Sequence, residues 1–318
     1  MTEWVRVPAP AKLNLFLHVL GRRPDGYHAL ESFFQLIDFN DYLSFSVRDD
    51  GQVSRINDVP AVTPEQDLCV RAARLLQSES GVSLGVDIRV EKHLPMGGGL
   101  GGGSSDAAST LLALNRLWRL GWSRDRLQQL ALRLGADVPV FVFGENAFAQ
   151  GVGEQLSAIT LPQTWYVVLV PDVQVSTIAI FSHPELTRDS KSINMLDFPD
   201  AVGFRRLLRQ EQRLKTGETV GETVDGTSFA GLGRWLWHDT RNDLQAVVCQ
   251  RYPQVEEAIK WLEQHAAARM TGSGACVFAT FEREDEARYV LSQLPGYMYG
   301  VVAQGLAQHP LRDWVGDG

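Results

Sequence analysis

A run of glycines is the first segment of the sequence whose composition points to chemistry. Six of the seven positions 97–103 are glycine, and Leu100 is the exception. Glycine tolerates positive φ and leaves the backbone bare, so several N–H groups of such a loop can turn toward one anion. A phosphate chain is the natural ligand of that arrangement. The run lacks the Gly-Lys-Ser/Thr ending of a Walker A loop and the spacing of a dinucleotide-binding loop, and a flexible linker is the alternative.

Polar residues beside the run can belong to the same site. We expect one of Ser104 and Ser105 to cap the following helix and the other to reach a phosphate or a magnesium ion, with Ser105 the candidate metal ligand. Capping alone is the alternative for each serine. Lys92 can lean over a nucleotide, or it can be an ordinary surface lysine. The predicted nucleotide contacts are Lys92, Pro95, Met96, Gly97, Gly98, Gly99, Leu100, Gly101, Gly102, Gly103, Ser104 and Ser105.

Two charged side chains lie in apolar stretches, where a charge is unusual. Asp137 follows a predicted helix end and precedes a proline, so it either caps the next short helix or does chemistry. Lys12 is flanked by alanine and leucine, so it is either a snorkelling surface residue or a lysine with a partner. Asn14 is two residues further along the same predicted strand and shares the face of Lys12.

Hydrophobic periodicity predicts the elements that must position these residues. In the first half, Ser123 and Gly135 are candidate caps of one helix, and residues 49–52 resemble a hairpin turn. We expect strands over 4–20, interrupted at Pro8 and Pro10, over two stretches of 29–48, and over 81–95, and helices over 65–79, 104–121 and 123–135.

The pattern starts again after residue 160, which predicts an α+β protein with two domains, 1–160 and 161–318. Residues 216–228 are polar and glycine-rich, typical of an exposed loop. In this second half we expect strands over 165–171, 269–281 with a tight turn inside, and 297–306, and helices over 253–265 and 282–294.

Composition limits the classes of protein. The chain has 318 residues, 44% of them apolar and 21% charged, which excludes collagen-like, mostly disordered and coiled-coil proteins. No apolar run approaches the ~18 residues of a membrane span, and we expect no signal peptide. Cys69, Cys249 and Cys276 are far apart, so neither a disulfide framework nor a zinc site is expected, and a reducing cytoplasm fits.

The formal net charge of −8 argues against a nucleic-acid partner. The charge is uneven, however. Residues 1–30 carry four basic and two acidic side chains, and residues 86–135 carry seven basic and four acidic ones. These two segments contain Lys12 and the glycine run, which indicates a small phosphorylated ligand.

Three segments, in order and at suitable spacing, resemble the GHMP small-molecule kinases. They are PAKLNL (10–15), LPMGGGLGGGSSD (94–106) and TGSGACVF (271–278). With PDGYH (24–28) and LGADVPVF (134–141), the likeness is closest to the members that phosphorylate the 2-hydroxyl of a cytidyl-linked methylerythritol in the non-mevalonate isoprenoid pathway. Residues 196–240 look longer and more polar than this family's pattern.

This resemblance implies the fold, the ligands and the setting. The first lobe would resemble ribosomal protein S5 domain 2, and the second would be ferredoxin-like, with both substrates in the cleft between them. The ligands would be ATP, Mg²⁺ and a small cytidine diphosphate substrate, without nucleic acid or membrane. The enzyme would be cytoplasmic, as a monomer or a homodimer.

The resemblance also implies roles for single residues. Asp137 would be the catalytic base and Lys12 its charge partner. Tyr27 and His28 would stack on and pair with cytosine, although an exposed tyrosine and a solvated histidine are the alternative. Asp67 stands where the family tends to offer an asparagine near adenine, and Ser273 would contact phosphate. The predicted substrate contacts are Asn14, Tyr27, His28, Phe34, Thr177 and Phe181.

Two rival functions remain open. One is another small-molecule kinase, or a decarboxylase that phosphorylates first, against which Tyr27 and His28 argue. The other is a nucleotide-sensing protein without catalysis, against which the retention of both Lys12 and Asp137 argues.

Overall fold

The computed structural model describes residues 3–60, 62–193 and 236–317. Its contacts group the chain into two units that are interleaved in sequence. The first unit contains residues 1–12, 36–145 and 308–318, and the second contains 13–35 and 146–307. The boundary at residue 160 stays a prediction. The expected loop at 216–228 and most of 196–240 lie outside the described residues.

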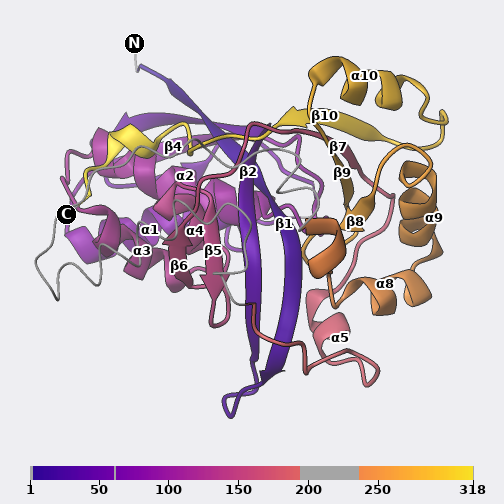
Figure 1. Ribbon diagram of the computed structural model, residues 1–318. Coiled ribbons are helices and arrows are strands. Elements are labelled where there is room, and N and C mark those ends of the chain that lie inside the picture. Colours follow the sequence, from indigo (N-terminus) through magenta and orange to yellow (C-terminus); the bar gives the residue numbers. More distant parts are fainter. Residues whose placement is uncertain (1–2, 61, 194–235, 318) are drawn as a thin grey trace, which may run out of the picture. The chain divides into compact units, whose positions relative to one another are not determined.

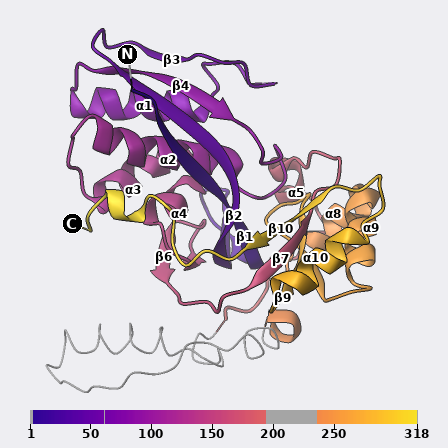
Figure 2. The same cartoon turned by 90° about the horizontal axis from the view of Figure 1, so that it is seen from above.

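Strands β1 (Val5–Arg22) and β2 (His28–Arg48) run through both units. In the first unit, β2 pairs antiparallel with β4 (Gly85–Glu91), and β3 (Val53–Arg55) pairs in parallel with the other edge of β4. The expected hairpin at 49–52 is therefore wrong, because β4 lies between the two strands that this turn connects (Figure 2).

Both early strands are longer than predicted. Pro8 and Pro10 do not interrupt β1. The direction of the N–H groups on their side of the strand explains why. The N–H of Lys12, on the same side as these prolines, donates to Leu100 O at 3.0 Å and not to a strand. A missing N–H on that side costs no ladder bond. The second strand is continuous because β5 pairs with one end of it and β4 with the other.

Four helices of the first unit hold the predicted site residues. Helix α1 (Leu68–Ser80) begins at an Asp67 cap and ends at Gly81, and the predicted cap Ser123 is confirmed for α3 (Arg124–Leu132). Helix α3 ends before the expected cap Gly135. Helix α2 (Gly102–Leu117) is largely buried and packs against α1 and α4 (Val138–Phe143). A short 3₁₀ helix, Arg312–Trp314, closes the unit.

The second unit has the predicted mixture of strands and helices. Strands β5 (Ala147–Gln150) and β6 (Gln155–Ala158) extend the sheet beyond the first part of β2. The other sheet is antiparallel, in the order β10 (Gly300–Gln304), β7 (Trp165–Leu169), β9 (Val277–Phe281) and β8 (Ala268–Met270).

Helices complete this unit, which Figure 1 shows around the antiparallel sheet. Helices α9 (Pro253–Leu262) and α10 (Glu284–Ser292) contact its strands, as their apolar spacing predicts. The shorter α5 (Thr177–Phe181) and α8 (Gln245–Arg251) contribute to the same apolar core. No helix in the described part of the chain is both long and apolar enough to cross a membrane.

A buried arginine connects three segments of the second unit. Arg269 on β8 is 5% exposed. Its guanidinium donates to Leu15 O on β1, to Leu236 O, and to both the carbonyl and the hydroxyl of Thr240, at 2.6 to 2.8 Å. Burial lowers the pKa of Arg269 to about 9. The four hydrogen bonds offset the cost of removing this charge from water.

We expect Arg269→Met to destabilise the fold by about 3 to 5 kcal/mol, because three backbone carbonyls and one hydroxyl lose their donor inside the core. Urea denaturation measures the change. The control is Arg283→Met, whose side chain is 63% exposed and pairs with Asp285, and it should change stability by at most about 0.5 kcal/mol. Equal effects of the two substitutions would contradict the assigned function of Arg269.

Candidate active site

The glycine loop, residues 95–101, connects β4 to α2 in the first unit. Gly97, Gly99 and Gly101 have φ of 70°, 77° and 74°. These are left-handed values that side chains other than glycine rarely adopt. At Gly101 a Cβ would also come within 2.9 Å of the Phe141 ring and 3.3 Å of Lys12 Cε. The backbone path of the loop therefore requires glycine at these three positions.

Helix α2 begins two residues before the predicted start, and its N-cap is Gly101 without a side-chain bond. The expectation that Ser104 or Ser105 caps the helix is wrong. Glycine permits the earlier start because a Cβ on Gly102 would lie 3.1 Å from Leu94 Cβ. The Ser105 hydroxyl is instead buried inside the helix, and it has no hydrogen-bond partner among the described residues.

Lys12 and Asp137 are brought together, as the sequence predicts. Lys12 Nζ lies 3.5 Å from Asp137 Oδ2, and the side chains are 3% and 41% exposed. Asp137 occupies the N-cap position of α4 but makes no capping bond with its side chain, so helix capping does not use this carboxylate. The site thus has a buried ammonium beside the glycine loop and a half-exposed carboxylate next to it.

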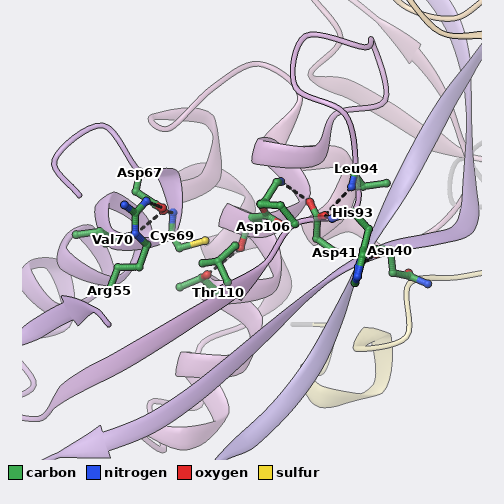
Figure 3. A network of polar contacts seen from close by, with 12 residues as sticks. Asn40, Asp41, Arg55, Asp67, Cys69, Val70, His93, Leu94, Asp106 and Thr110 are labelled. Atoms are coloured by element: carbon green, nitrogen blue, oxygen red, sulfur yellow. Dashed lines mark hydrogen bonds and ion pairs between the residues drawn. The ribbon is translucent and has the colours of Figure 1, made fainter. Parts of the chain in front are cut away.

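Lys92 pairs with two buried carboxylates, Asp41 and Asp106, which are labelled in Figure 3. Its ammonium contacts Asp41 on β2 and donates to Asp106 Oδ2 on α2 at 2.7 Å. Asp41 is fully buried and also accepts the N–H groups of His93 and Leu94, at 2.5 and 2.8 Å. The sequence offers two alternatives for Lys92, a nucleotide contact and a solvated surface residue. Neither anticipates that its ammonium pairs with both Asp41 and Asp106.

Asp106 differs from an ordinary surface aspartate. Its removal from water raises the pKa of Asp106 to about 7, because burial outweighs the stabilising charge of Lys92. Oδ2 of Asp106 accepts from Lys92, whereas Oδ1 is buried and has no hydrogen-bond partner in the described part of the chain. Ser105 Oγ and Asp106 Oδ1 are thus two unsatisfied oxygens, carried by consecutive residues in the first turns of α2.

Asp67, the predicted adenine contact, is a structural cap in this fold. One of its oxygens accepts the N–H groups of Cys69 and Val70, and the other accepts Arg55 Nη1 at 2.6 Å (Figure 3). The side chains of Arg55 and Asp67 are 3% and 7% exposed. Both oxygens are occupied by protein donors, and contact with adenine stays a prediction.

The second unit contains the residues predicted for cytosine. The rings of His28 and Phe181 are 5.2 Å apart between centroids, tilted by 31°. Arg188 Nε donates to His28 Nε2 at 3.1 Å, and its other nitrogens bind the carbonyls of Phe181, His183 and Leu186. Burial, then the charges of Arg188 and Arg22, lower the pKa of His28. A neutral ring that accepts at Nε2 carries its proton at Nδ1.

Other predicted substrate residues vary in exposure. The Tyr27 ring is 65% exposed, as either alternative for this residue allows, and Phe34 is only 3% exposed on β2. Asn14 is buried, and its Nδ2 donates to Ser32 Oγ at 2.7 Å. The hydroxyls of Thr177 and Ser273 are 2.7 Å apart, so two segments predicted separately lie together.

Sequence reasoning missed two residues of these groups. Arg188 lies in a stretch without clear periodicity, and nothing in its neighbours marks it. Asp41 lies between the two strands predicted within 29–48, where a polar residue reads as a turn. The sequence does show an aspartate within a stretch of alternating apolar residues. This position indicates a buried charge only once 28–48 is known to be one continuous strand.

Comparisons with known proteins identify the family of this chain. Residues 67–145 match the model described as "GHMP kinases N terminal domain", and residues 225–300 match "GHMP kinases C terminal". The fold and these matches therefore define a GHMP kinase.

Two curated relatives bear the name 4-diphosphocytidyl-2-C-methyl-D-erythritol kinase. The protein of Aromatoleum aromaticum is 52% identical and is aligned over 99% of this chain and 98% of its own length. That of Thiobacillus denitrificans is 54% identical over 97% and 98%. Within the GHMP kinases, the chain belongs to the 4-diphosphocytidyl-2-C-methyl-D-erythritol kinase family.

Solved structures agree with this assignment. A crystal structure of 4-(cytidine 5'-diphospho)-2C-methyl-D-erythritol kinase is 30% identical, with a TM-score of 0.73 over 95% of this chain and 99% of that one. The mevalonate kinase of Methanococcus jannaschii is 13% identical, with a TM-score of 0.62 over 96% and 99%, and it shares the fold alone.

We expect Gly101→Ala to destabilise the protein by about 2 to 4 kcal/mol, from left-handed strain together with the clash at Phe141. The matched control is Gly121→Ala, because Gly121 has φ of 65° but no atom within 4 Å of a Cβ. The control should cost only about 1 kcal/mol. Chemical denaturation compares the two, and equal losses would contradict the tight contact at Gly101.

Proposed function

We propose that this protein transfers the γ-phosphoryl group of ATP to the 2-hydroxyl of 4-diphosphocytidyl-2-C-methyl-D-erythritol, a step of the non-mevalonate route to isoprenoid precursors. The observation that carries the proposal is the ion pair between Lys12 and Asp137 beside the glycine loop. The names and full-length identity of the relatives support the choice of substrate.

The step needs a base and a positive charge. The substrate oxygen forms a bond to the γ-phosphorus while the bond to the β,γ-bridging oxygen breaks, and ADP leaves. Asp137 accepts the hydroxyl proton, which its 41% exposed carboxylate can reach because no capping bond restrains it. The Lys12 ammonium orients that carboxylate and offsets negative charge as the phosphoryl group moves.

The glycine loop would hold the phosphates of the donor. Bare backbone at Gly97, Gly99 and Gly101 and the uncapped start of α2 offer N–H groups to an anion. The predicted contacts from Pro95 to Ser105 belong to this part of the proposal. Lys92 belongs to it indirectly, because its ammonium pairs with Asp41 and Asp106 next to the loop.

One observation supports a magnesium site in this chain. No group of three or more His, Cys, Asp or Glu side chains suited to a metal occurs in the described part of the chain. Ser105 Oγ and Asp106 Oδ1, however, are buried oxygens without partners, and oxygen is the ligand type that Mg²⁺ prefers. These two atoms would hold the ion, whose chemistry is to neutralise charge on the donor phosphates.

The second unit would bind the cytidyl end of the acceptor. His28 presents a ring nitrogen whose proton position Arg188 fixes, and Phe181 lies against the same ring. Tyr27 offers an exposed aromatic face on which a base can stack. Asn14, Phe34 and Thr177 complete the proposed acceptor residues.

We expect Asp137→Asn to lower kcat by about 10²- to 10⁴-fold, because the hydroxyl loses its proton acceptor. Steady-state kinetics measure this loss, and calorimetry should find nucleotide affinity within a few-fold of the parent. Asp285→Asn, which removes a 73% exposed carboxylate, is the control and should leave kcat unchanged. A kcat of Asp137→Asn within three-fold of the parent would exclude Asp137 as the base.

Removal of either proposed stacking ring should weaken acceptor binding alone. We expect Tyr27→Ala and Phe181→Ala each to raise KM for the cytidyl substrate by about 10-fold, since a stacked base is stabilised by roughly 1 to 3 kcal/mol. KM for ATP should stay within two-fold. Tyr297→Ala, at a ring that is 75% exposed, is the control. Parallel changes in both KM values would argue against these rings as a cytosine site.

A further inference from the structure

We propose that Asp41 is a positioning residue for the phosphate donor: through Lys92 it joins the two ends of the glycine loop and so fixes the path of the loop. The inference rests on the proposed function only in assigning the loop to ATP. Asp41 itself is an interior residue of β2 and would touch neither substrate.

The first observation concerns the end of the chain segment that enters the loop. Asp41 Oδ1 accepts the backbone N–H groups of His93 and Leu94, the residues that follow β4 and precede the loop (Figure 3). A second bond supports this junction, because the His93 ring Nδ1 lies 3.2 Å from Asn40 O. Neighbouring residues of β2 therefore hold the entry to the loop by its backbone and by a side chain.

The second observation concerns the exit. Lys92 Nζ contacts Asp41 Oδ2 and donates to Asp106 Oδ2, which belongs to the second turn of α2. The same Asp41 oxygen would be 3.5 Å from a Cβ on Gly102, the first residue of that helix. One fully buried carboxylate thus lies against both the residues that lead into the loop and the helix that leaves it.

The charges of Asp41, Lys92 and Asp106 indicate that this network positions the loop backbone. Two carboxylates, Asp41 and Asp106, both pair with the single positive charge of Lys92. The ammonium group therefore already has protein partners. A fully ionised network would carry a net negative charge near a loop assigned to a polyanion. The network therefore favours phosphate binding by holding the glycine backbone in place, not by adding attraction.

Asp41 also contributes to stability, so the test needs a measurement that stability alone does not change. Asp41→Asn keeps the size of the side chain and an oxygen that accepts from His93 and Leu94, but it removes the charge that holds Lys92. Asp87→Asn is the matched control. Asp87 lies on β4, pairs with Arg48 at 3.0 Å, and is 22% exposed in its side chain.

Calorimetry measures binding of a non-hydrolysable ATP analogue and, separately, of CDP as the acceptor probe. We expect Asp41→Asn to raise Kd of the analogue at least 10-fold and to leave Kd of CDP within two-fold, with a folded state verified by thermal unfolding. Asp87→Asn should leave both affinities within two-fold. If Asp41→Asn does not fold, Asp106→Asn, measured in EDTA so that metal binding does not contribute, should give the same selective loss.

An analogue affinity within two-fold of the parent in a folded Asp41→Asn protein would overturn the inference. Equal loss of analogue and CDP binding would also overturn it, because it would indicate general loosening of the fold. A parent protein that binds the analogue but does not phosphorylate the cytidyl substrate would refute the proposed function, while a selective effect of Asp41→Asn on the analogue would still support the role of Asp41.

Discussion

An ammonium group removed from water must be neutralised where it lies, and Lys12 imposes this requirement on the first unit. Its side chain is 3% exposed, its N–H binds Leu100 O, and its ammonium faces Asp137. The Lys12 stem also passes close to Gly101, where a Cβ would lie 3.3 Å from Lys12 Cε, so a side chain at this position would force the lysine to shift. One charge thereby constrains a strand, the glycine loop and the start of α4.

The rest of the unit follows a similar rule, in which buried ion pairs hold the starts of helices. Arg55 of β3 pairs with Asp67 at the start of α1, and Lys92 joins Asp106 of α2 to Asp41. Helices α1 and α2 pack against each other, and Figure 3 shows Asp67 with Arg55 and, in the same view, Asp106 and Asp41. Because desolvated charges without partners are costly, each pair favours a single placement of its helix.

Residue types and spacing predicted a large part of this arrangement. The glycine run indicated phosphate binding, and the lysine and aspartate in apolar stretches were recognised as unusual before the structure paired them. The pairing itself came from a family resemblance, since Lys12 and Asp137 are far apart in sequence. Helices such as α9 and α10 were predicted because their apolar faces repeat at helical spacing.

What sequence reasoning missed depends on contacts between distant segments. Asp41 and Lys92 are 51 positions apart, and only the pairing of β2 with β4 brings them together. The same pairing defeats the predicted hairpin at 49–52, because local turn residues do not reveal that a later strand will lie between their neighbours. The prediction that a serine caps α2 was wrong because the helix begins earlier, at Gly102, with Gly101 as its N-cap.

The interleaving of the two units has a consequence for folding during synthesis. The first unit is completed by residues 308–318, where His309 is fully buried, with its Nε2 3.3 Å from Ser109 Oγ, and where Arg312 and Val315 carbonyls bind Arg124. These contacts join residues about 190 to 200 positions apart. The ribosome must therefore release the chain as far as residue 315 before the unit that contains Lys12 can close, so the unit that begins first is not finished until the second unit has been synthesised.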